Sequence, residues 1–359
     1  MKLFISQFVL LLPCLVFAQG ESVNPSVPQN DLFEERVKLN NFYLVADKAK
    51  NTLFVRSFDS QNKELASFRA ISGANFGDKL REGDKKTPEG IYFVENKIHP
   101  SRLDARHGSV AYKLNYPNPY DIINKRSGHG IWIHGVENEA RLDKRYDTLG
   151  CIALSNSKIS RLGKLFTNRR TPIVVVDRQS AEEPIGVLPE THPLVARIHQ
   201  WAADWSSKDV DAYLAYYHKD FLGRKMNYKQ WRWYKKSLAA RYKWIKITLS
   251  EVVVLRHGKY AVATFKQHYE SDLYSDSTRK RLYLVGSDEK ALILAEENVR
   301  IKNKNFIMPK SKPMQIAYEA PRAPAEKITE SEASVIDFGN VEVKPIGEPK
   351  LSALEVLNF

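Results

Sequence analysis

The chain has 359 residues, of which 43% are hydrophobic and 27% are charged, and its formal net charge is +13. This length and apolar content are ample for two packed domains and a tail. No apolar run after the N-terminus approaches the length of a membrane span, which excludes an integral membrane protein once a leader is removed.

Residues 1–18 are predicted to form a secretory signal peptide. Lys2 precedes the apolar run FISQFVLLLPCLVF, and Val16 and Ala18 occupy the two positions that a signal peptidase reads. The run is too short to anchor the chain in a bilayer. The alternative is a lipoprotein acylated at Cys14, but Pro13 then stands where a small residue is wanted. We therefore expect an exported protein.

Export changes the meaning of both the charge and the cysteines. A strongly basic cytosolic protein would suggest nucleic acid as partner, whereas an exported one meets anionic envelope polymers; a solvated basic surface without a single target is the alternative. Cys14 lies in the predicted signal, so Cys151 is the single cysteine expected in the mature chain. An internal disulfide is then excluded, and a lone thiol in an oxidising compartment is either a liability or a tool.

Residues 19–40 are predicted to be an N-terminal arm. Pro25 and Pro28 come first, and a short helical pattern follows over Leu32–Leu39. A helix this short is not stable alone, so it must dock. Docking on a second copy would make a homodimer, and docking on its own domain is the alternative.

Residues 41–178 are predicted to form a β-rich domain. Short alternating apolar segments occur at Phe42–Val45, Thr52–Phe58 and Gly90–Val94, and turns rich in Gly, Asn and Asp separate them. The run Thr171–Val176 is continuously apolar, which indicates a buried strand.

Residues 190–303 are predicted to form a separate α+β domain with a curved antiparallel sheet. Leu194, Ile198, Trp201 and Trp205 follow one face of a helix, and the two tryptophans are expected in the core. Trp231 and Trp233 could be core or line a pocket. Alternating segments at 245–250 and 260–265 indicate strands, with a turn at His257–Gly258. Residues 304–359 are Pro-rich and charged, and are predicted to be an extended tail.

Cys151 and His134 are the candidate catalytic pair. A thiol is only slightly ionised near neutral pH unless a neighbouring base or positive charge lowers its pKa, and His134 ends an apolar strand pattern from which it can supply such a base. Gly150 permits a tight turn that leaves backbone N–H groups free for a developing oxyanion. On spacing alone, a structural histidine and a small core cysteine are an equal alternative. His192 and His199 lack further ligands, so no metal is expected.

Three cations between the base and the nucleophile, Arg141, Lys144 and Arg145, could form a lid that binds a substrate carboxylate; a solvated loop is the alternative. His129 shares strand parity with Ile131, so we expect it behind His134, and it is placed with the substrate-binding residues.

Four ordered motifs resemble the L,D-transpeptidase catalytic domain of the YkuD type: Ser72–Gly73, Gly83–Tyr92, Gly130–Gly135 and Thr148–Leu154. The resemblance covers about 41–177. The second domain is similar to the NTF2-like or SnoaL-like cone, and the layout resembles periplasmic L,D-carboxypeptidases that help to set cell shape. The resemblance implies a periplasmic enzyme that has no cofactor and that acts on peptidoglycan stem peptides and not on nucleic acid.

The resemblance also implies a mechanism. Cys151 would attack the carbonyl on the L-centre of the third stem residue and release the terminal D-alanine, with His134 as base and a main-chain carbonyl near Gly135 as its orienting group. Thr148 belongs to the signature and is placed with the substrate-binding residues. Leu149 and Ala153 depart from the transpeptidase pattern, which favours hydrolysis of tetrapeptides to tripeptides. A transpeptidase forming 3-3 cross-links and a non-catalytic peptidoglycan-binding protein are the alternatives.

Overall fold

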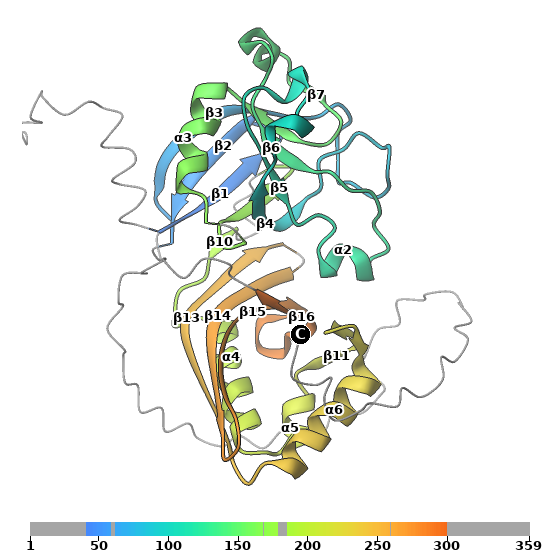
Figure 1. The fold of residues 1–359 in the computed structure, drawn as a ribbon, viewed down its shortest axis with the longest axis vertical. Coiled ribbons are helices and arrows are strands. Elements are labelled where there is room, and N and C mark those ends of the chain that lie inside the picture. Colours follow the sequence, from blue (N-terminus) through green and yellow to red (C-terminus); the bar gives the residue numbers. More distant parts are fainter. Residues whose placement is uncertain (1–40, 59–61, 168, 179–184, 259, 300–359) are drawn as a thin grey trace, which may run out of the picture. The chain divides into compact units, whose positions relative to one another are not determined.

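The computed structural model describes residues 41–58, 62–167, 169–178, 185–258 and 260–299 (Figure 1). The predicted signal peptide, N-terminal arm and tail lie outside these described residues. Among the described helices, none combines the length and the apolar character needed to cross a bilayer.

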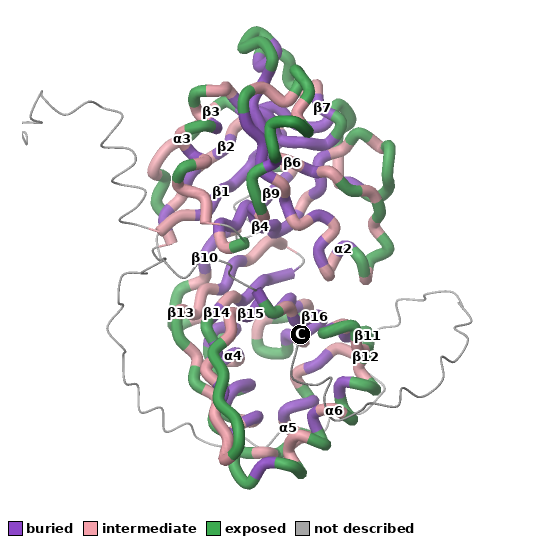
Figure 2. The backbone as a smooth tube through the Cα atoms, viewed as in Figure 1, coloured by how far each residue is buried: buried purple, intermediate pink, exposed green. Residues whose placement is uncertain are grey.

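Residues 41–176 form a nine-stranded sheet in the order β2-β1-β9-β4-β5-β6-β8-β3-β7, and β2 also pairs with β3, so the sheet curls back on itself. The alternating segments of the sequence become its strands, which Figure 2 shows to carry much of the buried backbone. The strands are β1 (Phe42–Asp47), β2 (Thr52–Ser57), β3 (Glu64–Gly73), β4 (Gly90–Lys97), β5 (Ala111–Leu114), β6 (Trp132–His134), β7 (Tyr146–Thr148), β8 (Ile152–Leu154) and β9 (Pro172–Val176).

The predicted buried strand is β9, in which all five residues are buried. It lies between β1, to which it is parallel, and β4, to which it is antiparallel. A strand covered on both faces needs apolar side chains at every position, and this explains the unbroken run. The domain also contains α2 (Pro119–Ile123), α3 (Asn156–Leu165) and the 3-10 turns η1 (Pro100–Arg102), η2 (Ala105–His107) and η3 (Glu139–Asp143).

Helix α3 covers part of this sheet and follows the nucleophile strand directly. The Ser155 side chain caps it by accepting from the Lys158 N–H. Ile159 and Leu162 are fully buried and join the apolar cluster formed by β1, β4, β5, β6 and β8. The helix therefore braces the strands that carry the candidate catalytic pair.

The second domain is a seven-stranded sheet in the order β10-β13-β14-β15-β16-β11-β12, packed with three helices. The predicted α+β class is confirmed in both domains. The elements are β10 (Gly186–Val187), α4 (Pro193–Ser206), α5 (Val210–Leu214), β11 (Tyr217–Gly223), β12 (Met226–Asn227), α6 (Tyr228–Arg241), β13 (Ile245–His257), β14 (Tyr260–Ser271), β15 (Ser275–Val285), η4 (Asp288–Lys290) and β16 (Leu292–Val299).

The tryptophans of this domain divide between core and surface. Trp201 and Trp205 are 0% and 8% exposed, as predicted from their helical spacing. Trp231 is also buried at 1% exposure, whereas Trp233 on the same helix is 66% exposed. Trp231 is therefore a core residue and Trp233 a surface residue.

A charged network lies inside this core. Glu296 is 5% exposed and accepts hydrogen bonds from Lys280 Nζ at 3.0 Å and from the Tyr217 hydroxyl at 2.5 Å. Lys235 Nζ lies 3.1 Å from the centroid of the Trp205 ring, and burial lowers the pKa of this lysine well below its ordinary value. Buried charges persist in a core only when such partners offset their desolvation.

Candidate active site

Cys151 lies in a tight turn between β7 and β8, and the preceding glycine makes the turn possible. Gly150 has φ +124°, in the region that favours glycine. A Cβ at this position would meet the Lys86 carbonyl oxygen at 2.7 Å and Ile131 Cδ1 at 3.0 Å. The backbone before the thiol is thus packed against two other segments, and a side chain at residue 150 does not fit.

Two threonines hold the backbone of the nucleophile. Thr148 Oγ1 donates to the Cys151 carbonyl at 2.7 Å and accepts from the Gly150 N–H at 3.1 Å. Thr87 Oγ1 lies 3.5 Å from the same carbonyl and accepts from the Gly73 N–H at 2.8 Å. Thr148, expected to bind substrate, is buried and shapes the turn instead. Since Gly150 N–H is occupied, the Cys151 N–H is the candidate oxyanion donor.

His134 lies on the strand next to that of the nucleophile. Strands β6 and β8 run parallel, with Ile133 opposite Ile152 and His134 opposite Ala153. The Cys151 thiol lies against the start of β6, where Sγ accepts from the Trp132 N–H at 3.4 Å and lies 3.5 Å from the Gly130 carbonyl oxygen. The parallel pairing therefore brings together base and nucleophile, which are separated in the sequence by a long loop.

The carbonyl of Gly135 orients the imidazole. His134 Nδ1 lies 2.5 Å from this oxygen, so Nδ1 is assigned as the donor and Nε2 as the acceptor. A Cβ at Gly135 would collide with Asn156 Oδ1. Asn156 Nδ2 in turn donates to the Val136 carbonyl at 2.6 Å, which fixes the end of β6 against α3.

Burial sets the protonation of both groups. It lowers the pKa of His134, which is 2% exposed, to about 4, despite the opposing effect of the Gly135 carbonyl. It raises the pKa of the Cys151 thiol to about 11, although the Trp132 N–H opposes this shift. At neutral pH the resting pair is therefore a neutral thiol and a neutral imidazole. The lowered thiol pKa expected from the sequence is not found, since desolvation outweighs the distant cations.

A second imidazole, which the sequence analysis missed, packs against the base. The His107 ring centroid lies 4.8 Å from that of His134 in an edge-to-face arrangement, and 4.8 Å from that of Trp132. His107 Nδ1 is 2.7 Å from Asp104 Oδ1, but the contact lacks hydrogen-bond alignment. The only sequence signal for this wall of the site is the Gly108 that follows His107 and packs on Gly135.

Arg141 is an internal brace of the loop between His134 and Cys151. It is 8% exposed, with Nη1 2.8 Å from Glu137 and Nε 2.7 Å from Asp147. It also donates to the carbonyl oxygens of Arg106 and Asp147, each at 2.8 Å. With these contacts made inside the protein, the expectation that Arg141 binds a substrate carboxylate is not supported. Lys144 and Arg145 are exposed in the same loop.

The structure does not bring His129 to the site. Its side chain is 83% exposed and lies 3.3 Å from Glu82. The strand begins only at Trp132, so the strand parity from which His129 was placed does not extend back to it.

Leu149 is 66% exposed and Phe76 54% exposed, and Phe76 packs edge-on against Tyr146. These exposed apolar side chains lie next to the nucleophile in the chain or in contact with β7.

The segment before β4, residues 74–89, is organised by one carboxylate. Asp84 accepts from the backbone N–H groups of Leu80, Arg81 and Lys86 at 2.9 to 3.1 Å and pairs with Lys79 Nζ at 2.7 Å. Burial would raise the pKa of Asp84, but these donors lower it to about 2. In this segment the Lys86 carbonyl packs against Gly150 and Thr87 contacts the Cys151 carbonyl. The segment therefore forms a wall behind the nucleophile.

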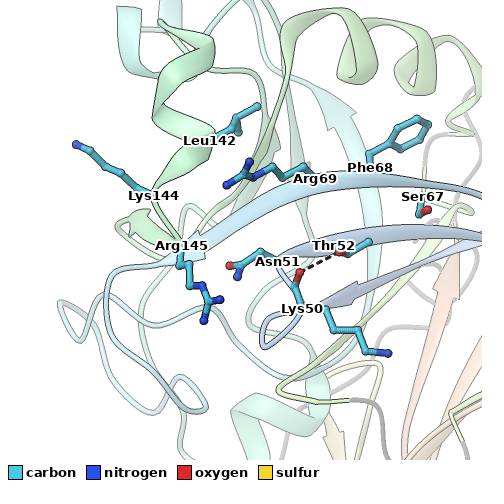
Figure 3. A pocket seen from close by; sticks show the side chains of 9 residues that line it. All are labelled: Lys50, Asn51, Thr52, Ser67, Phe68, Arg69, Leu142, Lys144 and Arg145. Carbon is cyan, nitrogen blue, oxygen red and sulfur yellow. Dashed lines mark hydrogen bonds between the residues drawn. The ribbon is translucent and has the colours of Figure 1, made fainter.

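A groove of about 380 Å³ lies beside the loop that Arg141 braces. Figure 3 shows its lining side chains, which come from the β1–β2 turn and the start of β2, from β3, and from η3 and the loop after it. Cys151 and His134 are not among them. The lining residues are Lys50, Asn51, Thr52, Ser67, Phe68, Arg69, Leu142, Lys144 and Arg145.

Comparison with known families and structures agrees with this geometry. Residues 41–175 match the L,D-transpeptidase catalytic domain, and residues 193–297 match the Cds6 C-terminal NTF2-like domain. The chain is 28% identical over 165 residues to the putative L,D-transpeptidase YafK of Escherichia coli, covering 44% of this chain. It spans 61% of the length of that curated relative.

Two solved structures resemble both domains together. Bd1075 of Bdellovibrio bacteriovorus is 26% identical with a TM-score of 0.61, over 72% of this chain and 92% of its own. The helical cell shape determining protein Pgp2 of Campylobacter jejuni is 25% identical with a TM-score of 0.56, over 75% of this chain and 99% of its own. The chain therefore joins a YkuD-family L,D-transpeptidase catalytic domain, residues 41–175, to an NTF2-like domain, residues 193–297.

Proposed function

We propose that the protein is a periplasmic peptidoglycan L,D-carboxypeptidase that trims stem tetrapeptides to tripeptides. The observation that carries this proposal is the neutral His134, held at Nδ1 by the Gly135 carbonyl on the strand next to Cys151. A base with a depressed pKa is unprotonated at neutral pH and ready to accept the thiol proton.

In the first half-reaction, His134 Nε2 takes the thiol proton as Cys151 Sγ attacks the carbonyl carbon of the bond before the terminal D-alanine. The Cys151 N–H donates to the developing oxyanion. When the tetrahedral intermediate collapses, the C–N bond breaks and the imidazolium gives its proton to the departing amine. D-Alanine leaves, and the tripeptide stays on Sγ as a thioester.

In the second half-reaction, neutral His134 takes a proton from water as the water oxygen attacks the thioester carbonyl. The C–S bond then breaks, Sγ recovers the proton from the imidazolium, and the tripeptide leaves with a new carboxyl group. The proton is transferred during each attack, because the thiol pKa of about 11 leaves almost no thiolate at rest.

Two residues support water over an amine as the acceptor. Leu149 is 66% exposed beside the nucleophile and offers no hydrogen-bonding group to an incoming amine. Ala153 is fully buried against Ile71, Val136 and Leu142, so this position faces the core and not an acceptor. A second stem peptide therefore finds no polar recognition at either position, whereas water needs none.

The likeness to Pgp2, the helical cell shape determining protein of Campylobacter jejuni, supports a role of this protein in cell shape, through the trimming of stem peptides in the periplasm. The NTF2-like domain contributes as a binding or positioning module.

The test is to incubate the purified mature protein with tetrapeptide and pentapeptide muropeptides and to separate the products. We expect tripeptides and free D-alanine, and no products from the Cys151→Ala variant. Products that are mainly 3-3 cross-linked dimers would identify a transpeptidase. Binding of muropeptides without turnover would identify a non-catalytic wall-binding protein.

A further inference from the structure

The groove beside the Arg141 loop has a one-sided charge. Four of its lining residues are cations, and its lining contains no Asp or Glu. Arg69 extends from β3 and Arg145 from the loop after η3, while the side chains of Lys50 and Lys144 point away from each other (Figure 3). A concave surface lined by charges of one sign concentrates ligands of the other sign. The groove is therefore suited to an anionic ligand.

The acids of the protein compete only weakly for these cations. Among the described residues, Lys144 and Arg145 have no carboxylate within ion-pair distance. The Arg69–Asp143 pair, at 3.1 Å, has side chains that are 57% and 74% exposed, and such a pair contributes little free energy, so a ligand carboxylate can replace it at small cost. The Lys50 side chain is 55% exposed and lies 3.9 Å from the buried carboxylate of Asp47, at the limit of an ion pair, so its ammonium group remains open to a ligand.

The same groove also offers an unused hydrogen-bond acceptor. Asn51 Oδ1 is shielded from solvent and has no hydrogen-bond partner among the described residues. A shielded amide oxygen without a donor costs free energy, and a ligand N–H or O–H would recover it. Leu142 and Phe68 add apolar contact. The preferred ligand thus combines carboxylates with amide or hydroxyl donors.

The groove is close to the thiol but separate from it. Arg145 precedes Cys151 by six residues, so their Cα atoms are at most about 22 Å apart even if the chain between them is fully extended. Arg69 adjoins Ala70, which pairs with Leu154 just after the nucleophile. One polymer can reach both places, whereas a single short peptide bound at Cys151 need not.

We infer that this groove is a second subsite that binds an anionic stretch of the wall polymer beyond the peptide being cleaved. The inference rests on the proposed function, because it takes the polymer to be peptidoglycan with its free stem carboxylates. The groove holds the enzyme on the polymer while the thiol acts nearby. The groove therefore raises the affinity for intact wall and does not change the turnover of a small soluble substrate.

The test compares two double variants on two substrates. Lys50→Gln with Arg69→Gln removes two groove charges and keeps polar side chains of similar length. Lys97→Gln with Lys125→Gln removes two exposed charges elsewhere on the catalytic domain and is the matched control. On intact sacculi we expect the groove variant to raise KM about five- to tenfold at low salt, with kcat unchanged. On soluble tetrapeptide muropeptide, we expect both variants to match the wild type.

A pelleting assay separates this inference from the proposed function. In the Cys151→Ala background, which cannot turn over, the groove variant should bind sacculi five- to tenfold more weakly than the control does, and the difference should disappear at 0.5 M salt. Equal binding by the two variants overturns the inference even if the enzyme is active. A loss of binding to anionic phospholipid vesicles that equals or exceeds the loss on sacculi also overturns it, in favour of a membrane surface.

Discussion

The low pKa of His134 predicts that this one residue makes the free energy of unfolding fall as the pH becomes acidic. Its folded-state pKa of about 4 lies below the ordinary value of about 6.5 expected in the unfolded chain. Between these values the unfolded chain binds a proton that the folded protein does not. The contribution of His134 to stability is therefore complete above about pH 6.5 and is lost as the pH falls towards 4.

The magnitude follows from the two pKa values. Each pH unit between them is worth roughly 1.4 kcal/mol, so the full contribution is about 3 kcal/mol, and most of it is lost at pH 4.5. This is a large part of the 5 to 15 kcal/mol typical of folded proteins. It arises because the imidazolium would have to form in a site where His134 is 2% exposed.

The measurement is urea unfolding at pH 7.5 and pH 4.5, followed by circular dichroism, on the wild type and on His134→Gln. Glutamine cannot take a proton, and the other titrating groups are the same in both proteins. We expect the wild type to lose about 2 to 3 kcal/mol more than the variant between the two pH values. If both proteins lose the same amount within about 0.5 kcal/mol, the imidazole is not buried as described and the reasoning fails.

Three further predictions concern the nucleophile and its turn. Cys151→Ala and His134→Ala should each abolish turnover of muropeptides while circular dichroism shows an intact fold; near-normal activity in either folded variant would remove the mechanism. Gly150→Ala should cost about 2 to 4 kcal/mol of stability in urea unfolding, because the new Cβ meets Lys86 O at 2.7 Å at φ +124°. Gly83→Ala, at φ +79° with open space around it, should cost only about 1 kcal/mol, and equal losses would contradict the steric argument. Alkylation of Cys151 by iodoacetamide should be slow at pH 7 and accelerate up to the thiol pKa of about 11; a rate that is already maximal at pH 7 would show a preformed thiolate.

Local pattern was sufficient to predict the strands and the main helix face. The alternation at Phe42–Val45 and Thr52–Phe58 became β1 and β2, and the spacing of Trp201 and Trp205 placed both in the core. These predictions depend only on the spacing of apolar residues along a strand or a helix, which can be read directly from the sequence. The candidate pair was identifiable only through the motifs around it, because spacing alone left a structural histidine and a small core cysteine as an equal alternative.

Contacts between distant segments could not be predicted in this way. Thr87 reaches the Cys151 carbonyl from 64 residues away, and His107 reaches His134 from a separate turn. Arg141 was expected to face substrate because its charge is visible in the sequence, but its partners Glu137 and Asp147 are close only after the loop folds back. The direction of the thiol pKa shift was missed for the same reason, since burial is a property of the tertiary structure.

The brace made by Arg141 divides the loop between base and nucleophile into a part that must stay and a part that is free to vary. One guanidinium ties the two ends of the loop, Glu137 and Asp147, to each other and to the Arg106 carbonyl, a geometry that lysine cannot reproduce. The tip, residues 143–145, lies outside this tie. Residues at the tip can therefore be exchanged or inserted while His134 and Cys151 keep their positions, and under the proposed function such changes would adapt the protein to walls of different charge.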